Sequence, residues 1–193
     1  MRIILIRHGK TEANEKWLYC GFTDLPLSES GRSVLADQKE NSSYPDIKGF
    51  DIYTSGLART NETLNILFGD VEYQAVPDLR EMNFGEFEMK DYFALKDTEE
   101  YQRWYGSSPD TKTPGGESNL EMQERVLKAF RGIMSKGRDA LIVLHGGPIS
   151  AIMTDLFPNE SKSRLDWQPD GGCGFEIIKE NGYPPFYYPI PYQ

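Results

Sequence analysis

Two short apolar runs, each followed by a histidine and glycine, constrain the fold of this chain more than any other feature. Residues 3–6 are all aliphatic and lead directly into an Arg-His-Gly triplet centred on His8. Residues 140–144 read ALIVL and lead into His145 and two glycines. Apolar runs of this length are typical of strands buried on both faces, as in a parallel sheet covered by helices. His8 and His145 are the only histidines in the chain, so both are expected at strand ends.

Strand-like and helix-like patterns alternate along the chain, which predicts an α/β fold with three layers, α/β/α, around a mostly parallel central sheet. Strands are expected at residues 2–7, 50–55, 71–76, 140–144 and 174–179. Helices are expected at residues 28–41, 56–69 and 118–136, and from Pro148 onward. A chain of 193 residues is long enough to bury one sizeable core. We therefore expect residues 1–193 to form a single domain.

Local signals mark the ends of the predicted helices. Ser28 is a suitable N-cap for the first helix, and Gly69 is a suitable end for the second. Ser118 and Glu121 have the spacing of a capping box at the start of the third. Val34 and Leu35 are expected to face inward in the first helix, and the third helix carries Leu120, Leu127, Phe130 and Met134.

Residues 81–121 differ in character from the rest of the chain. They contain ten acidic and four basic residues, a local charge of −6, together with seven aromatic residues. This composition indicates a small helical lid, inserted over one edge of the sheet, and not a further strand. The aromatic side chains can form the lid's own small core, which is the interpretation we favour, or they can stack against an aromatic leaving group of a substrate.

The overall composition argues against several classes of protein. A net charge of −9 is unsuited to a general binder of nucleic acid or anionic membranes. No apolar stretch approaches the roughly 20 residues of a membrane span. Cys20 and Cys173 lie far apart without CxxC spacing, which argues against a disulfide framework or a zinc site and favours a reduced, cytoplasmic protein.

The C-terminal tail, residues 184–192, is rich in proline and aromatic residues. We expect it to pack on the surface, with a docking motif as the alternative. A homodimer through an exposed sheet edge is also left open, because the sequence neither requires nor forbids it.

The predicted strand ends bring the chemically interesting residues together. In open α/β sheets, ligands bind outside the carboxyl ends of the strands. Three such ends lead into Arg7 and His8, into the segment from Ser55 to Arg59, and into His145. Helices that begin there add free N–H groups and partial positive charge. Because arginine offers paired donors that match phosphate oxygens, this arrangement favours a phosphate pocket.

Five segments also resemble a known family. LIRHGKTEAN, YCGFTDLPLSESGR, SGLARTNET, LREMNFGEFE and VLHGGPI resemble, in order and spacing, the motifs of the histidine phosphatase superfamily, which has the phosphoglycerate-mutase-like fold. The resemblance extends from residue 2 to about residue 152. In its short length and its GFTDLPL segment, the chain is similar to the α-ribazole phosphatase-type members of the phosphatase branch.

The resemblance implies a role for each matching residue. It implies that His8 is the nucleophile and becomes transiently phosphorylated, and that Glu81 is the proton donor. The residues implied to hold the phosphate are Arg7, Asn14, Arg59 and His145, with Thr11 and Gly21 as further candidates. Gly21 is equally well explained as a turn residue. Glu86 and Glu88 lie close to Glu81 in the sequence, so the choice among these carboxylates depends on the motif.

These residue types suit phosphoryl transfer on chemical grounds. An imidazole with an ordinary pKa of about 6.5 is largely neutral and nucleophilic near pH 7. A phosphohistidine divides hydrolysis into two easier displacements, and a carboxyl group can protonate the leaving alkoxide. Two arginines and a helix start neutralise the phosphoryl charge. We therefore expect a metal-independent hydrolase of small phosphomonoesters that needs no cofactor.

The chain departs from the family pattern at three places. Lys10 stands where the family often has an acidic residue, Met89 follows FGEFE where a glycine is frequent, and Ser150 lies near a position that is often basic. The first two changes leave the implied catalytic residues intact. The third affects how the non-phosphate part of a substrate is held.

Two other functions are weighed against the phosphatase. A cofactor-dependent phosphoglycerate mutase is the main alternative, although mutases hold the substrate carboxylate with a basic insertion and the corresponding segment here is acidic. A non-catalytic scaffold with the same fold is the other. Such a protein would be expected to lose the nucleophile or an arginine, whereas this chain retains His8, Arg7, Arg59 and His145.

Overall fold

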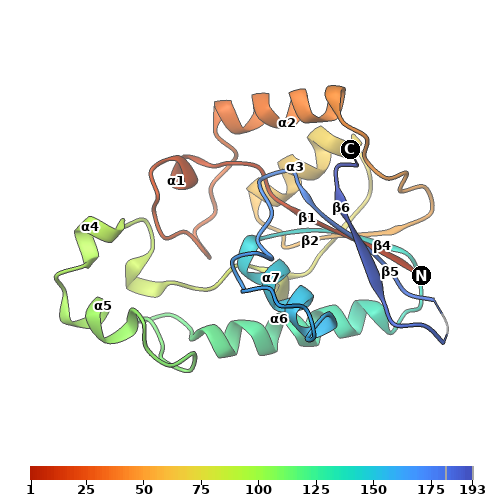
Figure 1. Cartoon of the computed structure of the whole chain (residues 1–193). Helices are drawn as coiled ribbons and strands as arrows, with labels where there is room; N and C mark the ends of the chain where they lie inside the picture. Colours follow the sequence, from red (N-terminus) through yellow and green to blue (C-terminus); the bar gives the residue numbers. More distant parts are fainter. Residues whose placement is uncertain (181, 193) are drawn as a thin grey trace.

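The chain is built around one six-stranded sheet in the computed structural model, which describes residues 1–180 and 182–192 (Figure 1). The strands are β1 (Arg2–Arg7), β2 (Asp51–Thr54), β3 (Gln74–Ala75), β4 (Ala140–Leu144), β5 (Gly174–Ile178) and β6 (Phe186–Ile190). Their order is β3-β2-β4-β1-β5-β6. The first three pairings along this order, from β3 to β1, are parallel, and the last two, β1 with β5 and β5 with β6, are antiparallel. The predicted α/β fold with a mostly parallel sheet is confirmed.

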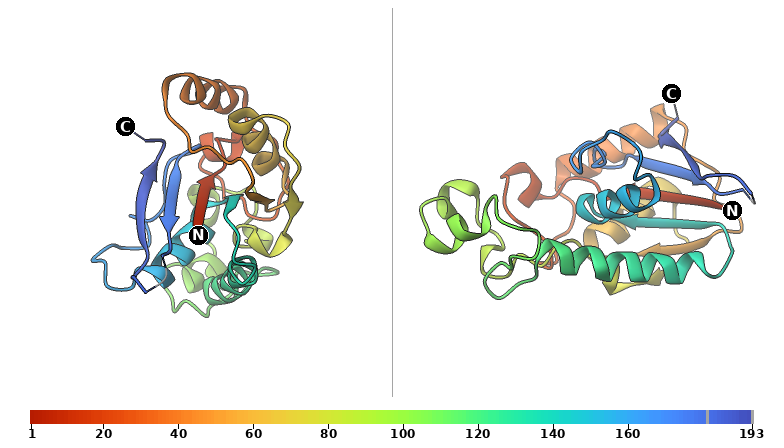
Figure 2. Two further views of the ribbon diagram at one scale, coloured as in Figure 1. Left: turned by 90° about the vertical axis from the view of Figure 1, so that its right-hand side faces the viewer. Right: turned by 60° about the horizontal axis from the view of Figure 1, so that its bottom comes forward.

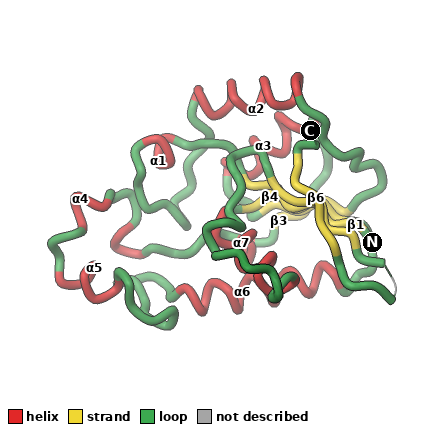
Figure 3. Tube along the Cα trace, viewed as in Figure 1, coloured by secondary structure: helices red, strands yellow, loops and turns green. Residues whose placement is uncertain are grey.

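Helices cover both faces of this sheet. α2 (Glu29–Asn41) and α3 (Ala58–Phe68) lie on one face, and α6 (Asn119–Met134) and α7 (Gly146–Leu156) lie on the other (Figures 1 and 2). The connections contain α1 (Glu12–Glu15), α4 (Tyr92–Leu95), α5 (Glu99–Trp104) and two 3-10 turns, η1 (Pro77–Leu79) and η2 (Gly85–Phe87). Figure 3 shows the strands gathered between the longer helices.

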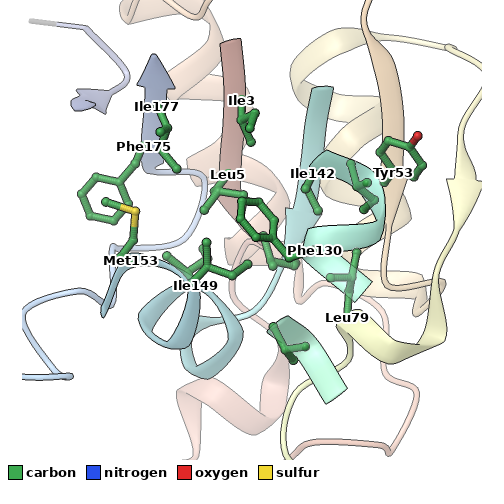
Figure 4. Close-up of a cluster of buried hydrophobic side chains, with 14 of the residues drawn as sticks. Ile3, Leu5, Tyr53, Leu79, Phe130, Ile142, Ile149, Met153, Phe175 and Ile177 are labelled. Atoms are coloured by element: carbon green, nitrogen blue, oxygen red, sulfur yellow. The ribbon is translucent and has the colours of Figure 1, made fainter. Parts of the chain in front are cut away.

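Alternate side chains of β1 fill two separate cores. Ile3 and Leu5 pack toward α6 and α7, where Figure 4 shows them with Phe130 and Ile149. Ile4 and Ile6 join the cluster on the face covered by α2 and α3. All four β1 side chains are fully buried, and each contributes about 1.5–3 kcal/mol through burial. A strand with both faces covered needs no polar side chain, which explains the unbroken apolar run.

Most of the predicted helix signals are confirmed. The Oγ of Ser28 accepts a hydrogen bond from the Gly31 N–H at 3.0 Å, α3 ends at Gly69, and Ser118 with Glu121 forms a capping box. The prediction that Val34 faces inward is wrong, since Val34 is 45% exposed; Leu120 is 44% exposed. Val34 precedes the buried Leu35 by one position, which turns it away from the sheet. Leu120 lies in the first turn of α6, next to the lid.

Two strand predictions need correction. The predicted strand at residues 71–76 is reduced to Gln74–Ala75 at the sheet edge, where its side chains are exposed and bury no apolar surface. The tail was expected only to pack on the surface, but residues 186–190 form the opposite edge strand β6. Pro189 pairs with Phe175 there, and an edge strand tolerates a proline because one side of its backbone needs no partner.

The predicted lid contains η2, α4 and α5 and lies beyond the carboxyl ends of the parallel strands, not over a lateral edge of the sheet (Figure 1). Its aromatic side chains form a separate small core, as favoured from the sequence. This core contains Phe87, Leu95 and Tyr101, with Tyr19, Phe84 and Trp104 packed against it. Among the described residues, no helix combines the length and apolar character needed to cross a membrane.

Candidate active site

The two histidines meet because their strands are neighbours. β1 and β4 pair in parallel with Arg7 opposite Leu144, so the residue after each strand emerges at the same edge of the sheet. The backbone N–H of His8 donates to the Leu144 carbonyl at 3.0 Å and continues the pairing by one residue. The rings of His8 and His145 lie edge to face, with centroids 4.9 Å apart.

The backbone determines which nitrogen of His8 carries a proton. Nδ1 lies 2.7 Å from the carbonyl oxygen of Gly9. A carbonyl can only accept, so Nδ1 carries the hydrogen and Nε2 keeps its lone pair. Burial, followed by the positive charge of Arg59, lowers the pKa of His8 to about 3; the Gly9 bond opposes this shift, and Arg7 lowers the pKa by a smaller amount. His8 is therefore a neutral imidazole with a free Nε2.

His145 is fully buried and forms the N-cap of α7. Its Nε2 lies 2.9 Å from the hydroxyl of Ser55, which follows β2. Its Nδ1 is buried without a hydrogen-bond partner among the described residues. Burial and the charge of Arg59 hold the pKa of His145 well below its ordinary value. This leaves one imidazole nitrogen unpaired, which is unusual because buried polar atoms are normally hydrogen-bonded.

Both arginines are held by backbone carbonyls. Arg7 donates from Nη1 to the Pro169 carbonyl at 2.8 Å. Arg59 is 1% exposed and donates from Nη1 to Thr23 at 2.9 Å and from Nη2 to Gly21 at 2.6 Å. Burial lowers the pKa of Arg59. Because a guanidinium has five N–H groups in a rigid fork, each arginine keeps donors for an anion.

Glu81 is tied to the start of α7. Its Oε2 accepts from the Gly147 N–H at 2.9 Å, and its Oε1 accepts from the Met82 N–H at 3.0 Å. A Cβ at Gly147 would lie 2.2 Å from Oε1 of Glu81, so only glycine permits this approach. The two neighbouring carboxylates lie elsewhere. Glu86 is exposed, and Glu88 is hydrogen-bonded to backbone N–H groups of residues 21–23.

Two adjoining cavities open beside these residues, with volumes of about 850 and 480 Å³. The larger is lined by Arg7, His8, Lys10 and Asn14 from the sheet side and by Tyr92, Tyr101 and Tyr105 from the lid. The smaller is lined by Glu81 and Gly147, together with the polar side chains of Arg164, Gln168 and Asn119. Leu18 and Tyr19 line both. His8 and Glu81 therefore lie on the walls of adjacent cavities.

Of the other residues predicted from the sequence, Asn14 lines a cavity and the rest lie behind these walls. Arg59 and His145 are buried and line neither cavity. Asn14 reaches the larger cavity, with its Oδ1 engaged by the N–H and hydroxyl of Thr11. Thr11 caps α1 and is 1% exposed. Gly21 lines neither cavity, because its N–H binds Glu88 and its carbonyl binds Arg59.

Residues from the connection between α7 and β5 were missed in the sequence. Arg164, Gln168 and Asp170 line the cavities. Residues 157–173 have no periodic pattern from which a site could be predicted. Ser150, singled out as a departure, anchors this connection: its hydroxyl donates to the Arg164 carbonyl at 2.6 Å. A cation is thus supplied to the smaller cavity from the loop instead of from position 150. Within the described part of the chain, no group of three or more His, Cys, Asp or Glu side chains is arranged to hold a metal ion.

Comparisons with known proteins agree with this geometry. The sequence profile of the histidine phosphatase superfamily (branch 1) matches residues 3–182. The chain is 30% identical to the adenosylcobalamin/alpha-ribazole phosphatase of Salmonella typhimurium, over 90% of this chain and 88% of that protein. It is 34% identical to a 2,3-bisphosphoglycerate-dependent phosphoglycerate mutase of Parvibaculum lavamentivorans, over 80% and 79%. The crystal structure of the alpha-ribazole phosphatase from Shigella flexneri superposes with a TM-score of 0.80 at 26% identity, over 94% and 92%.

Proposed function

The chain belongs to the histidine phosphatase superfamily (branch 1), and from this premise we propose that it is a metal-independent phosphomonoester hydrolase with a phosphohistidine intermediate. The observation that carries the proposal is the state of His8. Its Nδ1 is committed to the Gly9 carbonyl, and its pKa is lowered to about 3 by burial and Arg59. Nε2 is therefore a lone-pair donor, held rigidly on the wall of the larger cavity.

In the first step, Nε2 of His8 attacks phosphorus and the bond to the leaving oxygen breaks. In the second step, water attacks the phosphohistidine, the P–N bond breaks, and inorganic phosphate leaves. Phosphoryl transfer asks the protein mainly for positioning and for stabilisation of charge on the equatorial oxygens. Hydrogen bonding of Nδ1 to Gly9 supports both, because it fixes the ring and stabilises its N–H as the imidazole becomes phosphorylated.

Positive groups surround the proposed phosphoryl position. Arg7 lines the cavity next to His8, Arg59 acts on His8 through its charge, and α7 begins at Gly146 with its N–H groups near His145. The unpartnered Nδ1 of His145 provides a further group for a phosphoryl oxygen. Arginine donors and a helix start stabilise a phosphate without a bound cation.

Glu81 is the proposed general acid and base. Its carboxyl group lies on the wall of the cavity adjoining that of His8, and bonds to Gly147 and Met82 fix its orientation. In the first step it would give its proton to the leaving alkoxide. In the second it would take a proton from the attacking water, so the carboxyl group is regenerated. Such proton transfer contributes roughly 10²–10⁴-fold to a rate.

We propose α-ribazole phosphate, or a similar sugar or nucleoside phosphate, as the substrate. Two relatives compared above carry the name alpha-ribazole phosphatase. The tyrosines that the lid presents to the larger cavity, Tyr92, Tyr101 and Tyr105, offer rings for stacking with an aromatic group. Tyr101 also belongs to the lid core, so Tyr92 and Tyr105 are the better candidates for contact with substrate.

A phosphoglycerate mutase is the second candidate, because one relative named so is 34% identical. A mutase must hold a substrate carboxylate, and the described lid residues that line the larger cavity are tyrosines without a cation. This favours the phosphatase. Interconversion of 2- and 3-phosphoglycerate, primed with 2,3-bisphosphoglycerate and measured beside phosphate release, decides between the two activities.

The first experiment measures phosphate release from p-nitrophenyl phosphate with excess chelator, for the wild type and His8→Ala. We expect activity that survives the chelator and is lost in the variant. In a rapid quench, the wild type should also yield an acid-labile, alkali-stable phosphoprotein that the variant lacks. Equal activity in both proteins would remove His8 as nucleophile and overturn the mechanism.

A further inference from the structure

The carboxylate of Glu88 holds together two segments that are far apart in the sequence. It accepts backbone N–H groups from Gly21, Phe22 and Thr23 on one side and from Phe84 on the other, at 3.0 to 3.2 Å. Hydrogen bonds to an ionised acceptor are roughly twice as strong as neutral ones. Glu88 therefore fixes the loop at residues 21–23 against the segment that carries Glu81.

The same loop holds Arg59. The guanidinium donates to the carbonyls of Gly21 and Thr23 at 2.6 and 2.9 Å. The Gly21 carbonyl and the Phe22 N–H belong to one planar peptide group and point in opposite directions. Glu88 binds one end of this group at 3.0 Å, and Arg59 binds the other. The orientation of that peptide, and with it the position of the guanidinium, thus depends on the Glu88 carboxylate.

Close packing leaves this arrangement little freedom. A Cβ at Gly21 would lie 1.6 Å from the Met82 carbonyl oxygen, so the loop is pressed directly against the segment that follows Glu81. Burial lowers the pKa of Arg59, and the negative charge of Glu88 is among the neighbouring charges that oppose this effect. Glu88 thereby also favours the charged form of the arginine. Its oxygens are engaged by backbone donors, which makes it unsuited to proton transfer.

We infer that Glu88 is a positioning residue for phosphoryl transfer, acting through the Gly21–Phe22 peptide on the Arg59 guanidinium. The inference rests on the proposed function, in which Arg59 stabilises the phosphoryl group. It assigns Glu88 a task distinct from that of Glu81, although both belong to one motif. Loss of Glu88 should weaken binding of a tetrahedral oxyanion and slow the chemical step together, because both depend on where the guanidinium lies.

The test compares Glu88→Ala and Glu88→Gln with Glu86→Gln, a matched change at an exposed carboxylate two residues away. The readouts are kcat and KM for p-nitrophenyl phosphate and the inhibition constant of vanadate, with circular dichroism and thermal melts to establish folding. We expect Glu88→Ala to reduce kcat/KM by up to about 100-fold, the loss that a misplaced group can cause. Glu88→Gln keeps one acceptor oxygen and should lie between Glu88→Ala and the wild type. Glu86→Gln should match the wild type, and vanadate affinity should fall in parallel with kcat/KM.

A double-mutant cycle with Arg59→Lys separates positioning from general support of the fold. If Glu88 acts through Arg59, adding Glu88→Ala to Arg59→Lys should reduce kcat/KM by less than about 3-fold further. A full multiplicative loss in that background, or wild-type kinetics in folded Glu88→Ala, would overturn the inference. Failure of the proposed function is distinguishable, because the wild type itself would then show no His8-dependent phosphate release.

Discussion

Nε2 of His145 lies 2.9 Å from the hydroxyl of Ser55, so the histidine after β4 is held by the serine that follows the neighbouring β2. Ser55 in turn contacts the hydroxyl of Thr60 in α3 at 3.1 Å. The contact fixes the His145 ring in a place where no solvent reaches it. His8, 4.9 Å away between ring centroids, shares the same buried and positively charged surroundings, and this has a consequence for stability.

Protonation of either histidine should oppose folding. The pKa of His8 is lowered to about 3, mainly by burial and Arg59, and that of His145 is lowered well below its ordinary value for the same reasons. Below pH 6.5 the unfolded chain binds protons that the folded protein does not. The stability contributed by the two neutral histidines is therefore complete above pH 6.5 and decreases as the pH falls toward 3. From pH 7 to pH 5, protonation linked to His8 should cost about 2 kcal/mol of unfolding free energy, and His145 should add a loss in the same direction.

Urea unfolding at pH 7 and pH 5 measures this effect. His8 and His145 are the only histidines in the chain, so the double variant His8→Asn, His145→Asn serves as the control for all other titrating groups. We expect the wild type to lose at least about 2 kcal/mol more than the double variant between the two pH values. An equal pH dependence in both proteins would contradict the assigned cause.

Two Gly→Ala substitutions should have opposite effects on stability. A Cβ at Gly21 would lie 1.6 Å from a backbone oxygen of Met82, so Gly21→Ala should force the loop away and cost at least about 2 kcal/mol. Gly132 is exposed in α6 and a Cβ there would meet nothing within 4 Å. Gly132→Ala should therefore stabilise by up to about 1 kcal/mol. Chemical denaturation of both variants tests the pair, and a stable Gly21→Ala protein would contradict the described packing.

The sequence predicts what depends on local pattern. The buried β1, the cap at Ser28, the capping box at Ser118 and the convergence of His8 with His145 all follow from short-range periodicity and from the geometry of parallel sheets. These features repeat along the chain or depend on neighbouring strands, so they can be recognised in the amino-acid sequence.

Contacts between distant segments produce no pattern that can be recognised in the sequence. Arg59 is held by carbonyls more than thirty positions away, and a backbone carbonyl looks the same in every residue type. Arg164 enters its cavity from a connection without periodicity. The motif resemblance named Arg59, but neither its fixation by residues 21–23 nor the role of Glu88 is encoded in spacing, because both depend on how loops pack after the sheet has formed.

Arg125 should be more important for stability than any exposed arginine. It donates to the carbonyls of Asp78, Arg80 and Glu81 and to the carboxylate of Glu117, whose side chain is 16% exposed. Arg125→Met would leave these acceptors without their donor and should cost about 3 kcal/mol. Because Arg125 binds the backbone of Glu81, kcat should fall as well. Unfolding curves and initial rates measure the two effects.

Arg131→Met is the matched control on the same helix. Arg131 is 64% exposed and pairs with Asp155 at 2.8 Å, and exposed ion pairs contribute about 0–1 kcal/mol. The control should therefore change the unfolding free energy by less than about 1 kcal/mol and leave kcat unaltered. Similar losses of unfolding free energy in both variants would show that the buried hydrogen bonds of Arg125 contribute no more to stability than an exposed ion pair.

Met89 occupies a backbone conformation that suits glycine. Its φ is 61°, in the left-handed region, where a residue with a Cβ costs roughly 1–2 kcal/mol. In this conformation its N–H donates to the Tyr19 carbonyl at 2.7 Å, next to the Glu88 carboxylate. The side chain is 39% exposed and contributes only part of its burial energy. We therefore expect Met89→Gly to raise the unfolding free energy by about 1 kcal/mol.

Met89→Ala separates backbone strain from side-chain loss, since it removes the same packing but keeps the Cβ. It should be no more stable than the wild type, and a gain from Met89→Ala equal to that from Met89→Gly would show that strain is not the cause.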